Sequence, residues 1–134
     1  MIQIRTIIEI AGFPKEHVEE TMFKVIKNLK DNKNLKILKT SVAPVEEIKT
    51  MWSSFVELDA ELPDFKELLN FCFDFTPSSI EILKPEKIED NSEVFADFLN
   101  DLLARLHQYT AAVVNLNTQN KLLKKRLGED QEEK

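Results

Sequence analysis

Three carboxylates alternate along one predicted strand, and their type and spacing could hold a metal ion. Glu57, Asp59 and Glu61 lie in the segment 52–62, on the face opposite its apolar residues. Carboxylate oxygens are the ligands that hard cations such as Mg²⁺ prefer, so a metal-dependent enzyme using these residues is one hypothesis. Arg5 falls on a strand predicted to lie alongside, and ion pairing on an open sheet face is the interpretation we favour. These four residues form a candidate open-face site.

The other reactive side chains match no catalytic or zinc-binding motif. His17 and His107 stand far from each other and from Cys72 in the sequence, whereas zinc sites draw on closely spaced His and Cys. Cys72 lies among apolar residues, where a buried thiol is expected. The chain has two glycines, too few for a phosphate-binding or dinucleotide-binding loop. We therefore expect no catalytic residue, no cofactor and no enzymatic activity.

The spacing of apolar residues predicts six elements in residues 1–84. Strand-like alternation runs over 2–10, 52–62 and 79–84, and more weakly over 35–42. Helical spacing predicts one helix from Pro14 to about Lys30, and a shorter one that begins at Pro63 and ends before Pro77. The polar segment 43–50 is expected to be a long hairpin connection.

This β-α-β-β-α-β order predicts an α+β fold that resembles the ferredoxin-like architecture. Such a fold has a four-stranded antiparallel sheet with two helices on one face. The resemblance is one of element order and implies no activity. The residues predicted to form the core are Trp52, Val56, Leu58, Ile4, Ile8, Val25, Ile26 and Leu69.

The last third of the chain carries the heptad pattern of a coiled coil. Apolar residues recur in steps of four and three from Phe95 to Leu127, with Asn120 in the one polar core position. Asp90 and Glu93 are expected to cap this long helix. We expect its first half to pack on the preceding domain and its far half to pair with a second chain. The predicted dimerisation residues are Tyr109, Val113, Leu116, Asn120, Leu123 and Leu127.

Asn120 favours two parallel helices. Its amide can hydrogen-bond the same residue of an in-register partner, whereas antiparallel pairing about Val113 would place it opposite Leu106. The acidic start and basic end of the helix would suit the antiparallel arrangement, which stays open as an alternative.

Charge and hydropathy argue against nucleic-acid and membrane partners. The net charge is −6, and neither residues 1–90 nor residues 91–134 have an excess of Lys and Arg. Nucleic-acid binding depends on clustered cations, so no nucleic-acid partner is expected. No apolar run approaches the ~20 residues that cross a bilayer, and Arg5 and Glu9 interrupt the apolar N-terminus as no signal peptide does. We expect a cytoplasmic protein without a membrane partner.

These patterns divide the chain into a ferredoxin-like domain at 1–90, a long coiled-coil helix at 91–128 and a disordered acidic tail at 129–134. The favoured hypothesis is a non-enzymatic homodimeric adaptor, dimerised through the coiled coil, that binds a protein partner. The first alternative is a regulatory domain that senses a small ligand and resembles ACT-type modules in layout. The second is the metal-dependent enzyme that uses Glu57, Asp59 and Glu61.

Overall fold

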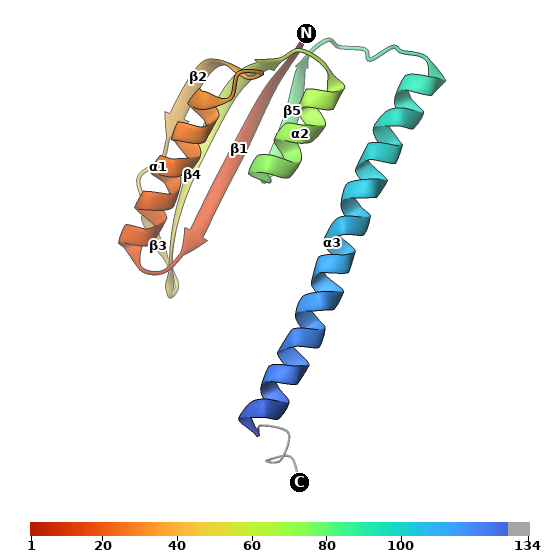
Figure 1. Cartoon of the computed structure of the whole chain (residues 1–134). Helices are drawn as coiled ribbons and strands as arrows, with labels where there is room; N and C mark the ends of the chain where they lie inside the picture. Colours follow the sequence, from red (N-terminus) through yellow and green to blue (C-terminus); the bar gives the residue numbers. More distant parts are fainter. Residues whose placement is uncertain (129–134) are drawn as a thin grey trace. The chain divides into compact units, whose positions relative to one another are not determined.

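Two long antiparallel strands form the centre of an α+β structure. The computed structural model describes residues 1–128, and the predicted acidic tail lies outside them. Within these residues the antiparallel sheet has five strands, and there are three helices (Figure 1). In chain order the elements are β1 (Ile2–Gly12), α1 (Lys15–Asp31), β2 (Lys36–Val42), β3 (Glu46–Ile48), β4 (Met51–Leu62), α2 (Phe65–Phe75), β5 (Ser79–Lys84) and α3 (Ser92–Leu127).

The strand order is β2-β4-β1-β5, and the short β3 also pairs with β4. β1 pairs with β4 over its whole length, from Ile2 opposite Leu62 to Gly12 opposite Trp52. β5 pairs with a much shorter part of β1, from Gln3 to Ile7. The chain divides into two compact units, one ending at Glu89 and one beginning at Asp90.

The core of the first unit follows from strand alternation. Ile4, Ile8, Val56 and Leu58 point to one face of the sheet and are buried, because alternate residues of a strand face the same side. α1 and α2 both lie on that face (Figure 1), and they add Met22, Leu29, Leu68 and Phe71 to the same cluster.

The polar side chains buried in this core are hydrogen-bonded. The Thr6 hydroxyl, which is fully buried, donates to the Ser79 carbonyl oxygen at 2.7 Å. The Ser54 hydroxyl donates to the Ala43 carbonyl oxygen at 2.9 Å. Within residues 1–128, every buried side-chain nitrogen or oxygen has a partner. The strand interiors therefore tolerate hydroxyls where the neighbouring backbone offers an acceptor.

The structure confirms most of the predicted core. Ile4, Ile8, Val56, Leu58 and Leu69 are buried, and Val25 and Ile26 pack partly buried against them. Trp52 is only half-buried. It pairs with Gly12 at the end of the sheet, and the Lys15 ammonium nitrogen lies 5.4 Å from the centre of its ring.

The predicted hairpin connection at 43–50 is wrong in part. Glu46–Ile48 forms β3, which pairs with Met51–Ser53 of β4, so the sheet has five strands rather than four. The turn between them places Lys49 in the left-handed region, at φ 57°. Neither a polar three-residue strand nor a lysine in that turn gives a sequence signal, because hairpin turns usually use Gly or Asn there.

The long helix is capped by Asn91 rather than by the predicted Asp90. The Asn91 side-chain oxygen accepts a hydrogen bond from the Val94 N–H at 2.9 Å, while Asp90 accepts one from the Asn91 N–H. At its other end, Gly128 adopts a left-handed conformation at φ 77°, which favours glycine at a helix C-cap. None of the helices in residues 1–128 is long and apolar enough to cross a membrane.

Candidate functional sites

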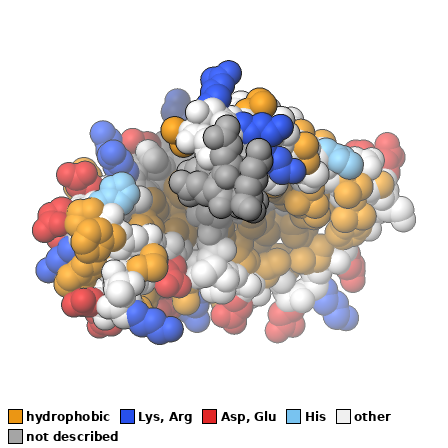
Figure 2. Space-filling model, turned by 90° about the horizontal axis from the view of Figure 1, so that it is seen from below, with side chains coloured by type: hydrophobic (Ala, Val, Ile, Leu, Met, Phe, Trp, Pro, Cys, Tyr) orange, Lys and Arg blue, Asp and Glu red, His pale blue; other side chains and the backbone are white. Residues whose placement is uncertain are grey.

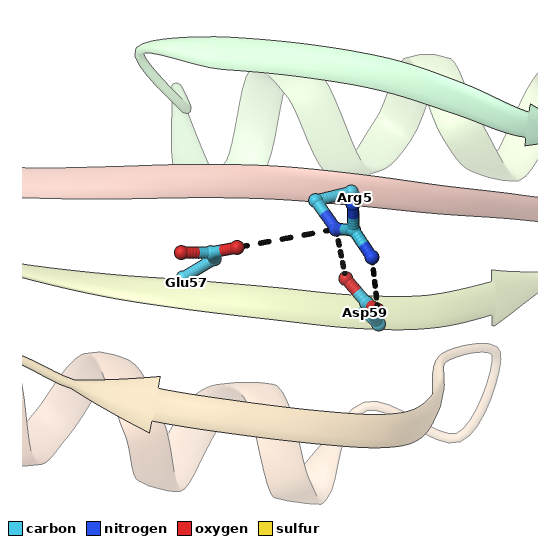
Figure 3. Close-up of polar contacts among 3 residues, drawn as sticks. All are labelled: Arg5, Glu57 and Asp59. Atoms are coloured by element: carbon cyan, nitrogen blue, oxygen red, sulfur yellow. Dashed lines mark hydrogen bonds and ion pairs between the residues drawn. The ribbon is translucent and has the colours of Figure 1, made fainter.

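Arg5 and Asp59 form a two-pronged ion pair on the face of the sheet that the helices leave open. The two residues are opposite each other in the pairing of β1 with β4. Arg5 Nε lies 2.9 Å from Asp59 Oδ1, and Arg5 Nη2 lies 3.1 Å from Asp59 Oδ2 (Figure 3). The planar guanidinium matches both carboxylate oxygens, and this geometry makes such hydrogen bonds strong and specific.

The other two predicted open-face residues differ in their distance from Arg5. Glu57 Oε1 lies 3.9 Å from Arg5 Nε, a looser contact (Figure 3). Glu61 is on the same face of β4 but stands opposite Gln3 and Lys36. The structure therefore brings Arg5, Glu57 and Asp59 together and places Glu61 further along the strand.

The ion pair stabilises the charged form of both groups. The hydrogen bonds from Arg5, reinforced by its charge, lower the pKa of Asp59 below its usual value, although partial desolvation acts in the opposite sense. The same contacts raise the pKa of Arg5 further above neutrality. At neutral pH the pair is fixed as guanidinium and carboxylate, so Asp59 is a poor general acid or base.

A shallow depression of about 210 Å³ surrounds this pair, lined by Arg5, Lys39, Ser41, Glu57 and Asp59. Lys39 and Ser41 come from β2, opposite Asp59 and Glu57. Neither residue is among the predicted open-face residues, because a register shift between Ile37 and Lys39 decides which β2 side chains stand beside β4. With two cations and two carboxylates, the lining neutralises most of its own charge.

The open face offers little to a metal ion. Among residues 1–128 no group of three or more His, Cys, Asp or Glu side chains is arranged to hold a metal. Asp59, the middle acid of the predicted trio, directs both carboxylate oxygens to Arg5. A cation would have to displace that guanidinium.

The remaining titratable candidates lie apart. His17 is exposed at the start of α1, and His107 is exposed on α3. Cys72 is partly buried on α2, and burial raises the pKa of its thiol. A thiol with a raised pKa holds little thiolate at neutral pH, so it is a weak nucleophile.

The predicted dimerisation residues all lie on α3. This helix has 36 residues and is about 54 Å long at 1.5 Å per residue. None of residues 92–127 is buried. The exposed fractions are 51% for Tyr109, 56% for Val113, 58% for Leu116, 52% for Leu123 and 75% for Leu127.

The heptad positions form one continuous line along α3, because residues three and four apart share a helix face. Asn120 is exposed on that line, between Leu116 and Leu123. The basic residues Lys124, Lys125 and Arg126 occupy the last turn, and Glu93 lies in the first. The helix dipole favours this order, with acidic residues at the start of the helix and basic residues at its end.

Comparison with known proteins identifies the family but no activity. No solved structure matches the chain. A relative from Methanocaldococcus jannaschii, the uncharacterized protein MJ0538, is 30% identical over 106 residues, which make up 78% of this chain and 38% of that protein. The chain thus corresponds to less than half of that relative's length. Residues 3–133 match the MJ0538 family, and the chain belongs to it.

Proposed function

We propose that the protein is a non-enzymatic homodimeric interaction module in which two α3 helices pair as a parallel coiled coil. The observation that carries the proposal is the apolar line along α3. Its members are about half-exposed in the single chain, as in Leu116 at 58% and Leu123 at 52%. Leucines at 3-4 spacing along one face of a helix are stabilised when a second helix covers them.

The first unit is proposed to be a ferredoxin-like domain that presents surfaces to a protein partner. The strand order β2-β4-β1-β5, with α1 and α2 on one face, supports this architecture. The other face carries the Arg5–Asp59 pair and is free of helices from the first unit. In this proposal the domain binds its partner while α3 sets the stoichiometry, and the protein acts in the cytoplasm.

A second candidate function is ligand sensing, in a domain laid out like the ACT modules. The depression around Arg5 and Lys39 favours it, because cations and a hydroxyl could orient an anionic group. Ligand sites are usually concave and largely apolar with few polar groups, whereas this one is shallow and charged. We therefore rank ligand sensing below the interaction module. The metal-dependent enzyme ranks below both, since the two carboxylate oxygens of Asp59 already accept hydrogen bonds from Arg5.

Native mass spectrometry combined with sedimentation equilibrium tests the proposal. We expect a species of twice the chain mass of 15.6 kDa, formed in a concentration-dependent manner and without added mass. A monomer at every accessible concentration would contradict the interaction module. A retained small molecule would favour the ligand sensor.

A further inference from the structure

β1 has a free edge over its second half. On one side it pairs with β4 along all of Ile2–Gly12. On the other side β5 covers only Gln3–Ile7, so β5 runs beside the first part of β1 alone (Figure 1). Within residues 1–128, the stretch Ile8–Gly12 pairs with no strand on that second side.

The backbone of this stretch has groups that point outward. The Ile7 carbonyl oxygen accepts a hydrogen bond from the Ser78 N–H at 2.8 Å, so it points to the β5 side. Neighbouring residues of a strand alternate in the side to which their backbone groups point. The N–H and C=O groups of Glu9 and Ala11 therefore point to the free edge. Such groups are a template for another strand.

The side chains along Ile8–Gly12 do little to prevent pairing with another strand. The opposite edge of the sheet, at β2, carries Lys36, Lys39 and a register shift, which are usual defences against strand pairing. The stretch Ile8–Gly12 has one charged residue, Glu9, and contains neither lysine nor proline. The contrast marks Ile8–Gly12 as the edge that is open to another strand.

We propose that this edge pairs with the same stretch of a second copy, in antiparallel orientation about a two-fold axis at Ile10. Glu9 of each copy then stands opposite Ala11 of the other, and the two Ile10 residues face each other. Because the backbone N–H and C=O groups of Glu9 and Ala11 point to the free edge, the pairing forms about four backbone hydrogen bonds. The inference rests on the proposed function only in that two copies associate, and it does not involve α3.

Charge and face select this register over one shifted by a single residue and over the one centred on Glu9. A shift by one residue would place helix-side residues opposite open-face residues, which sheet pairing does not allow. A register centred on Glu9 would place the two Glu9 carboxylates directly opposite, and would also require the Ile7 carbonyl that Ser78 already occupies. The register centred on Ile10 avoids both problems.

An exposed aromatic residue stands at the end of this edge. Phe13 follows β1 directly and is 72% exposed. In the proposed register it comes level with Ile7 of the second copy, where the first unit of that copy could cover it. Viewed from the end of the sheet at which β1 ends, the surface carries hydrophobic side chains beside charged ones (Figure 2).

Two substitutions of Ala11 in the full chain form a matched test. Ala11 is exposed, so neither should disturb the core. Ala11→Glu places like charges opposite Glu9 of the second copy, and we expect its dimer dissociation constant to rise roughly fivefold. Ala11→Lys places opposite charges there, and we expect roughly threefold tighter association. Sedimentation equilibrium measures both constants. Equal constants for the two variants would overturn the inference.

Amide hydrogen exchange tests the backbone contact directly. We expect protection of the Glu9 and Ala11 amides to rise with protein concentration, in step with the dimer. Ala11→Pro removes one donor on the free edge and leaves the bonds to β4 in place, so it should weaken the dimer and abolish the concentration-dependent protection of Glu9. Unprotected amides in a fully formed dimer would overturn the edge contact while leaving the α3 proposal standing. Protection that does not depend on concentration would overturn the second copy as the occupant.

Discussion

Arg5 and Asp59 join the two central strands by two hydrogen bonds, of 2.9 Å and 3.1 Å, on the face of the sheet opposite the helices. The pair accounts for the cluster of acids that first suggested metal binding. Asp59 is held as a carboxylate by the Arg5 guanidinium. Its consequences can be measured by titration and by mutation of either partner.

The carboxyl group of Asp59 should titrate below the value of about 3.9 for an unstructured aspartate. Carbon-detected NMR of the side-chain carboxyl measures this pKa, and Arg5→Gln should return it towards the ordinary value because the hydrogen bonds and the charge are lost. Arg5→Lys is the control that keeps the charge but loses the two-pronged geometry, so an intermediate pKa is expected. An ordinary Asp59 pKa in the unmodified protein would show that the pair does not persist in solution.

The same pair makes stability depend on pH in a defined direction. A carboxyl whose pKa is lower in the folded state stabilises it above the unfolded-state pKa, and this contribution disappears as pH falls through the folded-state pKa. The difference in unfolding free energy between the unmodified protein and Arg5→Gln should therefore shrink below about pH 4. Urea unfolding at a series of pH values measures it. A difference that grows on acidification would contradict the assignment.

The register of β4 can be tested with two alanine substitutions on opposite faces of the strand. Leu58 is fully buried, whereas Phe55 is 44% exposed on the open face. Leu58→Ala should lower the unfolding free energy by about 2–5 kcal/mol, the usual cost of a cavity in a packed core. Phe55→Ala should cost less than about 1 kcal/mol. Denaturant unfolding measures both, and a reversed order would mean that the strand presents its other face to the core.

Strand alternation predicted the central sheet well because burial imposes it directly. Ile4, Ile8, Val56 and Leu58 were all expected inside and are buried. Trp52 fitted the same alternation but lies at the sheet's end opposite Gly12, where no second layer covers it fully. Alternation indicates which face a residue occupies but not how far along the strand the covering helices reach.

Two contacts between distant segments give no signal in the sequence. β3 exists because a polar segment folds back on Met51–Ser53, and no propensity in Glu46–Ile48 indicates it. Lys39 stands opposite Asp59 because of the β2 register shift. By contrast, the Arg5–Asp59 pair can be predicted from the sequence, since the predicted topology places the two strands side by side.

Truncation after Ala111 tests whether the far half of α3 carries the dimer contact. The truncated protein should stay folded, because the buried core lies entirely in the first unit. Its dimer dissociation constant should rise by at least about tenfold, since it loses Val113, Leu116, Leu123 and Leu127. A protein ending at Gly128 keeps the whole helix and serves as the control. Sedimentation equilibrium at several concentrations measures both, and equally tight dimers would exclude α3 as the main contact.

The orientation of the helices depends on Asn120. In a parallel pair the two Asn120 side chains meet, whereas antiparallel pairing about Val113 leaves each buried amide opposite Leu106 at a cost of about 1–3 kcal/mol. The flanking positions offer little electrostatic selection. They contain no acid: Leu103, Thr110, Asn117 and Lys124 on one side, and Arg105, Ala112, Gln119 and Arg126 on the other.

Asn120→Leu should therefore raise the melting temperature and broaden the population towards trimers and tetramers. The substitution adds apolar burial and removes the polar pair that fixes register and helix number. Asn115→Leu makes the same chemical change two positions beyond Val113, off the apolar line, and should alter neither property. Sedimentation velocity and thermal unfolding by circular dichroism measure the outcome. If Asn120→Leu melts and sediments as Asn115→Leu does, then Asn120 lies outside any helix pair, and the coiled coil must end before it.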